Sequence, residues 1–198
     1  MLYKLAHIIK DKFSFLWEAI EWGNASLFYM LHKKQLAKVN KILEGISPKY
    51  IIRLATNNDV DILVHFFREQ PEGAFKFFRP HEFDEKAVRK VVNNKAFLTF
   101  LVLSDNELVG YFFLRAFVNG KCFRGKMVHK DLQGRAKLMG VAMTKVSQHL
   151  DLRMFGSISS ENYASMASAK ASNEIKIHKT LENGYYYIEF LPKIKIEK

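Results

Sequence analysis

The sequence contains a single cysteine, Cys122, among its 198 residues. One cysteine cannot form an intramolecular disulfide, so a disulfide-stapled fold is excluded and a reducing compartment, the cytoplasm, is the expected location. The start of the sequence lacks the charged, apolar and small-residue segments of a secretory signal. No stretch approaches the roughly 20 apolar residues that cross a bilayer.

Closely spaced metal ligands are also missing. The seven histidines lie far apart, and none stands at short spacing from another histidine or from the cysteine. Structural zinc sites use such short spacings between histidine and cysteine ligands. We therefore expect no metal.

Acidic residues are in the minority, since 31 lysines and arginines oppose 20 aspartates and glutamates and give a formal charge of +11. This excess favours an anionic partner: a nucleic acid, an acidic membrane surface or a phosphorylated small molecule. The basic residues are scattered along the sequence, which favours a solvated basic surface over a nucleic-acid interface. No nucleic-acid partner is expected. A hydrophobic content of 48% indicates a folded globular chain with a sizeable core.

Residues 1–47 have a helical pattern and are predicted to form a separate N-terminal extension. The stretch "EWGNAS" interrupts the pattern at residues 21–26, and "EGISPK" ends it with Gly45 and Pro48, so a helical hairpin is expected. An amphipathic basic hairpin could touch a membrane surface, pack on its own domain or pack on a second copy in a homodimer. Packing is favoured, because the polar positions include acids as well as lysines.

Residues 48–198 alternate between strand and helix patterns. The first strand, "YIIRLAT", precedes a helix that Asn57 or Asn58 should cap, an aromatic and basic loop, and a second helix, "DEKAVRKVVNN". Three strands follow, with turns at "SDNE" and "VNGK", and Asn-Gly between apolar runs is a strong hairpin signal. The full order is β-α-α-β-β-β-α-β-α-β-β. This predicts an α+β (α/β) domain with a mixed, mainly antiparallel sheet flanked by helices.

The fourth strand runs into "VHKDLQGRAKLM" at residues 128–139. With the order of elements, this segment resembles the GNAT superfamily of acetyl-CoA-dependent N-acetyltransferases over residues 49–192. The resemblance implies that the turn binds the pyrophosphate of acetyl-CoA. Free backbone N–H groups at the start of a helix do form an anion site.

Two residues depart from the glycines of the family's turn, namely Ala136 and Leu138. Alanine is a mild change, whereas the side chain of Leu138 must point away from the phosphate and into the core. Polar contacts from Gln133, Arg135 and Lys137 could compensate. An ordinary strand-to-helix turn remains the alternative.

The segment "SSENYASMASAK" carries a second part of the resemblance. Asn162 and Ser165 match two of the family's cofactor-binding positions, while Ala169 stands where a tyrosine is usual. Asn173 stands where a glycine is usual, and asparagine is the next best residue for a left-handed helix end. The cofactor-binding residues implied by the resemblance are Met127, Val128, Gln133, Gly134, Arg135, Ala136, Lys137, Leu138, Asn162 and Ser165, with a backbone N–H near Met127 or Val128 stabilising the oxyanion.

The resemblance implies direct attack of an amine on the thioester, which needs a base for the amine and an acid for the leaving thiolate. His129, at the end of the fourth strand, has a suitable ordinary pKa. Glu107 and Glu69 are alternative bases, and Tyr163 or Tyr185 could supply the proton.

The acceptor site should lie between the loops "PEGAFKFFRPHEF" and "LENGYYY", whose candidate substrate residues are Lys76, Phe78, Arg79, His81 and Tyr185. Aromatic rings beside cations would suit a nucleotide-linked amino sugar, although the phenylalanines could simply bury the loop. The leading hypothesis is an N-acetyltransferase for a small amine. A protein N-acetyltransferase and an inactive GNAT-like module bound to a membrane or partner are the alternatives.

Overall fold

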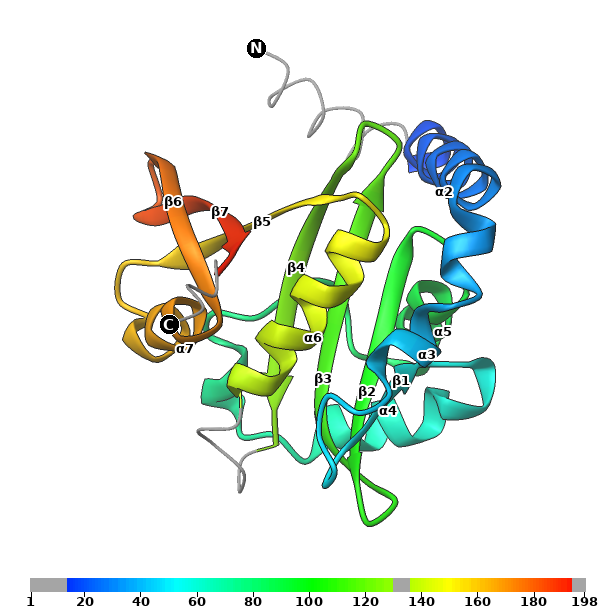
Figure 1. Cartoon of the computed structure of the whole chain (residues 1–198), viewed down its shortest axis with the longest axis horizontal. Coiled ribbons are helices and arrows are strands. Elements are labelled where there is room, and N and C mark those ends of the chain that lie inside the picture. Colours follow the sequence, from blue (N-terminus) through cyan, green and yellow to red (C-terminus); the bar gives the residue numbers. More distant parts are fainter. Residues whose placement is uncertain (1–13, 130–135, 194–198) are drawn as a thin grey trace, which may run out of the picture.

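The computed structural model describes residues 14–129 and 136–193. One seven-stranded sheet, in the order β1-β2-β3-β4-β5-β7-β6, forms the centre of this part of the chain (Figure 1). Its strands are β1 (Ile51–Leu54), β2 (Phe97–Ser104), β3 (Glu107–Phe117), β4 (Lys121–Val128), β5 (Arg153–Ser159), β6 (Asn173–Thr180) and β7 (Tyr185–Pro192). The predicted order of strands and helices is confirmed, as is the α+β class with a mixed sheet.

Tight turns set the central meander of β2, β3 and β4. Asp105 and Asn106 join β2 to β3 with φ angles of 51° and 68°, and Gly120 follows Asn119 with a φ of 74° before β4. These left-handed conformations suit asparagine, aspartate and glycine, which is why both turn signals could be recognised in the sequence. A third such turn places Gly184 between β6 and β7.

Helices cover both faces of the sheet. On one face, α4 (Val60–Arg68) and α5 (Glu85–Asn93) bury apolar residues against Leu101, Tyr111 and Met127. On the other face, α3 (Val39–Leu43), α6 (Ala136–His149) and α7 (Tyr163–Ser172) pack around Phe100, Phe112 and Ile188. Short 3-10 turns, η1 (Asn57–Asp59) and η2 (Glu72–Phe75), precede and follow α4. Burial on both faces explains why β2 is almost wholly apolar.

The predicted break at residues 21–26 is wrong, because α2 (Ser14–Leu36) runs through it without interruption. Asn24 does not end the helix. Its Nδ2 donates to the carbonyl of Ala116, and its Oδ1 accepts from the amide of Val118, so the amide side chain docks the helix on the end of β3. Phe28 is fully buried in the core and Glu21 pairs with Arg115 at 2.6 Å. The helix therefore packs on its own domain. Residues 1–13 of the predicted hairpin lie outside the described residues.

Two predicted helix ends also differ from the structure. Asp59, rather than Asn57 or Asn58, organises the start of α4, because its carboxylate accepts from the amide and hydroxyl of Thr56. Hydrogen bonds from Arg53 lower the pKa of Asp59 to about 2. Asn173 is not left-handed: with φ −136° and ψ 155° it is extended and begins β6 directly after α7.

Within the described residues, no helix is both long enough and apolar enough to cross a membrane.

Candidate functional site

The strands β4 and β5 are the parallel pair of the sheet, and their pairing is short. It joins Lys121 to Arg153, Cys122 to Met154 and Phe123 to Phe155, and then it stops. Both strands continue, β4 to Val128 and β5 to Ser159, while each remains paired with its other neighbour. The sheet therefore opens between the carboxyl-terminal halves of two adjacent strands.

A cavity of about 320 Å³, here called the strand-gap cavity, fills this opening. Residues from both helical layers line it, because the loop after η2 forms one wall and the start of α7 forms another. Its lining residues are Phe77, Phe78, Arg79, Pro80, Phe113, Arg124, Gly125, Lys126, Gly156, Ser157, Ile158, Ser159, Asn162, Ser165, Tyr185 and Phe190.

Two glycines in the cavity lining let aromatic rings pack directly on the strand backbone. A Cβ on Gly125 would overlap the ring of Phe113 and lie 3.0 Å from Phe78, so these rings lie directly over the β4 backbone. A Cβ on Gly156 would lie 3.0 Å from the ring of Phe190. The cavity thus has an aromatic wall on the α4–α5 side and backbone along its length.

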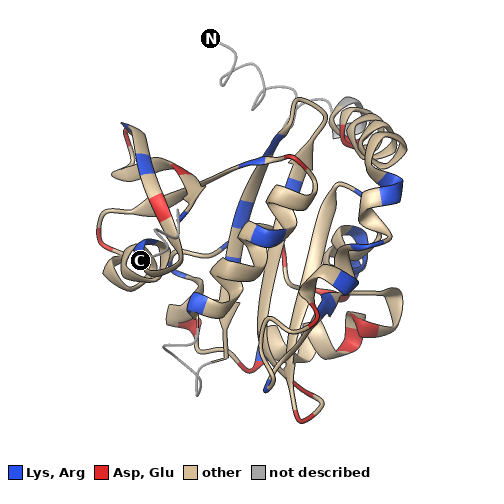
Figure 2. Cartoon of the chain, in the orientation of Figure 1, with Lys and Arg blue, Asp and Glu red and all other residues tan. Residues whose placement is uncertain are grey.

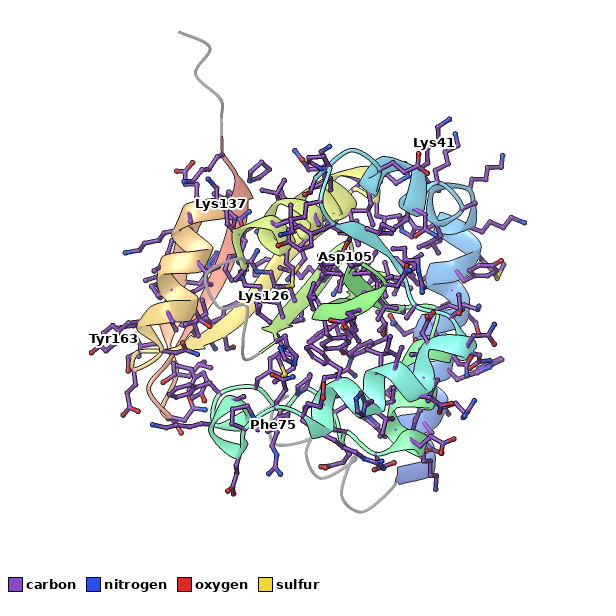
Figure 3. All side chains as sticks on the ribbon, turned by 90° about the horizontal axis from the view of Figure 1, so that it is seen from below. Lys41, Phe75, Asp105, Lys126, Lys137 and Tyr163 are labelled. Atoms are coloured by element: carbon purple, nitrogen blue, oxygen red, sulfur yellow. The ribbon has the colours of Figure 1, made fainter. Side chains whose placement is uncertain are left out.

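Arg124 and Lys126 point from β4 to the opposite side, toward α6 and α7. The Nη1 of Arg124 donates to Oδ1 of Asn173 at 2.8 Å, and its guanidinium stacks on Phe190 at 3.4 Å from the ring centroid. The Nζ of Lys126 donates to the carbonyl of Ala136 at 2.8 Å and to Oγ of Ser168 at 2.6 Å. Figure 3 shows Lys126 in the interior of the molecule. This lysine therefore ties β4 to the first residue of α6 and to α7.

Burial changes the proton affinities of both cations. It lowers the pKa of Lys126 to about 7, with a further contribution from Arg124, and it lowers the pKa of Arg124 to about 9. Burial also raises the pKa of the neighbouring Cys122 thiol to about 12. Near neutral pH, Lys126 can therefore hold or release a proton, while the thiol of Cys122 stays protonated.

The structure brings part of the predicted cofactor set to this cavity. Asn162 and Ser165 line it, and Oδ1 of Asn162 caps α7 by accepting from the amide of Ser165 at 3.0 Å. Leu138 packs against the core, as expected. Other predicted cofactor positions lie apart from the cavity. Met127 is buried toward α4, Val128 packs on the opposite face of the sheet, and Lys137 is exposed. The remaining predicted residues of the turn, Gln133, Gly134 and Arg135, lie outside the described residues.

The predicted bases gather at a second hollow, here called the His129 hollow, of about 520 Å³ between α4 and the ends of β3 and β4. Glu69, Glu107 and His129 all line it. The Nε2 of His129 lies 3.7 Å from Oε2 of Glu69, whose Oε1 is 3.4 Å from Nε2 of His65. None of these side chains lines the strand-gap cavity.

The two candidate proton donors, Tyr185 and Tyr163, lie in different environments. Tyr185 lines the strand-gap cavity from β7. Tyr163 is 80% exposed at the rim of α7 and does not line the cavity (Figure 3). Ala169, at the position of the family's tyrosine, is 1% exposed and belongs to the core. A phenol at that position would face packed side chains.

Among the predicted substrate residues, Phe78 and Arg79 line the cavity, as Tyr185 does. Lys76 is exposed and pairs with Glu161 at 3.3 Å. His81 lies away from the cavity in an aromatic cluster, where its Nε2 is 2.9 Å from the hydroxyl of Tyr111 and its Nδ1 is 2.6 Å from the carbonyl of Glu82. Burial lowers the pKa of His81.

Sequence reasoning missed Arg124, Gly125, Lys126 and Phe113. The signal for the two cations was "KCFRGKMV", a central strand whose charged residues alternate with apolar ones. That pattern also describes a strand with one face in water, which is how a charged strand is usually read. The described residues contain no group of three or more His, Cys, Asp or Glu side chains arranged to hold a metal.

No protein-family model and no curated protein matches the sequence. Solved structures do match. The GNAT domain of S. lividans PAT is 15% identical with a TM-score of 0.61, covering 70% of this chain and 88% of that one. The enzyme AAC(6')-Ib, solved with paromomycin and acetyl-CoA, is 11% identical with a TM-score of 0.58, covering 73% and 94%.

A third structure is the ribosomal L7/L12 alpha-N-protein acetyltransferase RimL in complex with coenzyme A. It is 17% identical with a TM-score of 0.56, and the match covers 73% of this chain and 93% of that one. At such identities the likeness concerns the backbone fold alone. The chain has the fold of the GNAT superfamily of acetyltransferases.

Proposed function

We propose that the protein is an N-acetyltransferase that moves an acetyl group from acetyl-CoA to a primary amine. The observation that carries this proposal is the strand-gap cavity, which is lined from both helical layers. Such an opening lets a cofactor arm and an acceptor meet from opposite sides of one sheet, and holding two reactants in register supplies much of the rate of a transfer reaction.

The residues at the opening fit acetyl-CoA. The cavity runs along the strand backbone at Gly125 and Gly156, and Asn162 and Ser165 offer polar atoms along its wall. Lys126 adds a cation on the α6 and α7 side. We propose that these residues, with Ala136, Lys137 and the turn before them, hold the cofactor. Bound there, acetyl-CoA would supply an acetyl group activated as a thioester.

The chain's own residues would prepare the acceptor. Phe78 and Phe113 cover the α4–α5 side of the cavity and exclude water from it. We propose His129 as the base, supported by its approach to Glu69, with Glu107 in the same hollow. Because none of the three lines the strand-gap cavity, the proton of the amine would pass to His129 through a bridging water. Tyr185 is the proton donor that the geometry favours over Tyr163, because its side chain lines the cavity.

The acceptor we propose is a small amine, with a nucleotide-linked amino sugar as the specific candidate. Arg79 lies beside Phe77 and Phe78 at the cavity wall, an arrangement that suits a phosphate next to an aromatic base. A protein amine is the second candidate acceptor.

The first experiment is a calorimetric titration with acetyl-CoA. Ser165→Leu places a large side chain in the cavity wall, whereas Ala164→Leu, the matched control, adds the same side chain at an exposed position of α7. We expect micromolar binding to the wild type and the control, and at least tenfold weaker binding to Ser165→Leu. Release of free coenzyme A only in the presence of an amine would then show transfer. Absence of binding would overturn the proposal, and binding without transfer to any amine would favour an inactive module.

A second role is proposed for α2. Trp22, Met30 and Leu31 are 73%, 69% and 63% exposed, and Lys33 and Lys34 follow them on the same helix. Apolar side chains beside lysines suit peripheral contact with an anionic membrane surface. Trp22→Ser with Met30→Ser should abolish flotation with phosphatidylglycerol vesicles, while vesicles of phosphatidylcholine alone should bind neither protein. A concentration-dependent dimer with no flotation would instead assign this face to a homodimer.

A further inference from the structure

The charge of the strand-gap cavity has one sign. Three of its lining side chains, Arg79, Arg124 and Lys126, are cationic, and no aspartate or glutamate is among the described residues that line it. Figure 2 shows basic positions along β4 in the middle of the sheet. An amine substrate with no other charge would find nothing in this cavity to attract it.

Elsewhere in the described chain, three partly buried or exposed arginines pair with carboxylates of low exposure. Arg53 binds Asp59 at 2.6 Å, Arg115 binds Glu21 at 2.6 Å, and Arg153 binds Glu189 at 2.8 Å. Arg124 and Lys126 depart from this pattern. Among the described residues, their hydrogen-bond partners are the neutral oxygens of Asn173, Ala136 and Ser168.

Two neighbouring cations without a counter-charge are costly in a protein interior, because burial removes water from each charge and each cation repels the other. Burial lowers the pKa of both groups, and the charge of Arg124 lowers the pKa of Lys126 further. A bound anion would relieve both costs at once. A phosphate or carboxylate accepts strong charge-assisted hydrogen bonds from lysine and arginine.

We propose that Arg124 and Lys126 form a subsite for an anionic group, a phosphate or carboxylate, carried by the ligand that enters the strand-gap cavity. The source of the anion is either a phosphate of coenzyme A or an acidic group on the acceptor, and this choice of sources rests on the proposed function. The existence of the subsite does not.

The subsite predicts a proton movement. Among the described residues, the charged group that acts on Lys126 is Arg124 on β4, while Arg79 in the loop after η2 and Tyr185 on β7 line the same cavity. No aspartate or glutamate is among the described residues that line the cavity. A bound anion would favour the ammonium form, and Lys126 should take up about one proton as the anion binds at pH 8.

The experiment is calorimetry of the full chain with inorganic phosphate at pH 8, in two buffers of different ionisation enthalpy. We expect proton uptake by the wild type and by Lys170→Met, which removes an exposed lysine from α7. Lys126→Met should bind phosphate at least tenfold more weakly and take up no proton. Proton uptake by the wild type tests the subsite without any variant. Arg124→Lys is a second variant, which keeps the positive charge at position 124.

Two matched pairs of probes identify the source. Acetyl-CoA is compared with acetylpantetheine, which lacks phosphate, and glucosamine 6-phosphate is compared with glucosamine. Uptake with acetyl-CoA and not with acetylpantetheine assigns the anion to the cofactor. Uptake with glucosamine 6-phosphate and not with glucosamine assigns it to the acceptor.

The subsite would be overturned if no anionic probe causes proton uptake, or if uptake and affinity are the same in Lys126→Met. Failure of the proposed function gives a different result. In that case, phosphate still binds with uptake in the wild type, whereas acetyl-CoA does not bind.

Discussion

The strand-gap cavity lies along β4, the His129 hollow lies just beyond the C-terminal end of that strand, and the two differ in nearly every chemical respect. The first is lined by cations, glycines and aromatic rings, without a carboxylate among its described residues. The second combines Glu69 and Glu107 with two histidines, His65 and His129. The cationic lining and the carboxylate–histidine lining are thus separated, the first along β4 and the second beyond its C-terminal end.

This separation illustrates how the electrostatics that suits anion binding differs from the electrostatics that suits proton exchange. A cavity that must hold an anion is better without carboxylates, because a nearby negative charge would repel the ligand. A group that exchanges protons with an amine benefits from a carboxylate close to it, as His129 has in Glu69. Four predictions test whether the two hollows have these distinct roles.

The largest effect is expected for Gly125→Val. The added side chain would overlap Phe113, whose Cζ lies 2.7 Å from the position of a Cβ, and would push aromatic rings into the cavity. Affinity for acetyl-CoA should fall about 100-fold, with a loss of stability of about 1–3 kcal/mol. Calorimetry and chemical denaturation measure the two effects. Gly73→Val, where a Cβ has no neighbour within 4 Å, is the control. Unchanged affinity would place the cofactor elsewhere.

The next effect is expected for His129→Gln. If His129 is the base, kcat should fall at least tenfold while the Kd for acetyl-CoA stays the same, because the ring does not line the cavity. His65→Gln is a matched control, since His65 shares Glu69 and lies in the same hollow. Equal kcat values for the two variants would remove the catalytic role from the His129 hollow.

A smaller effect concerns stability and pH. The pKa of Lys126 is lowered to about 7 in the folded chain, while the unfolded chain keeps an ordinary lysine. Between pH 7 and 8.5 the unfolded state therefore holds more protons, so the free energy of unfolding should rise with pH, by at most about 1.4 kcal/mol per pH unit. Urea denaturation at several pH values measures this slope. Lys126→Met should lack that contribution, and an identical slope in both proteins would contradict the burial of this charge.

The smallest effect separates the two tyrosines. Tyr185→Phe removes a hydroxyl from the cavity wall and should lower kcat severalfold, whereas Tyr163→Phe changes an exposed side chain and should leave kcat within about twofold. Steady-state assays with a saturating amine compare them. A larger loss in Tyr163→Phe would show that the end of α7 moves toward the cavity during the reaction.

The sequence allowed much of the fold to be predicted because its signals are local. The left-handed turns at Asn106, Gly120 and Gly184 require particular residues, and those residues are visible in the sequence. The start of α4 was assigned to the wrong residue because three candidates, Asn57, Asn58 and Asp59, are adjacent. The contacts with Arg53 and Thr56 distinguish Asp59.

The remaining errors depend on contacts between distant segments. Asn24 lies in a stretch typical of a helix end. Its side chain nevertheless forms hydrogen bonds with the backbone of residues more than 90 positions away. Arg124 and Lys126 alternate with apolar residues as in a half-exposed strand, and their burial follows from α6 and α7, which come later in the sequence. The opening between β4 and β5 has no local pattern at all.

The short pairing between β4 and β5 has a consequence for which parts of the fold open together. Three residue pairs join these strands, fewer than the four that join β1 to β2, whereas the β5–β7 and β6–β7 ladders are longer. Cooperative opening units tend to follow such divisions. The C-terminal strands should therefore exchange their amide hydrogens together, and a ligand that spans the opening should slow that exchange as a bridge would.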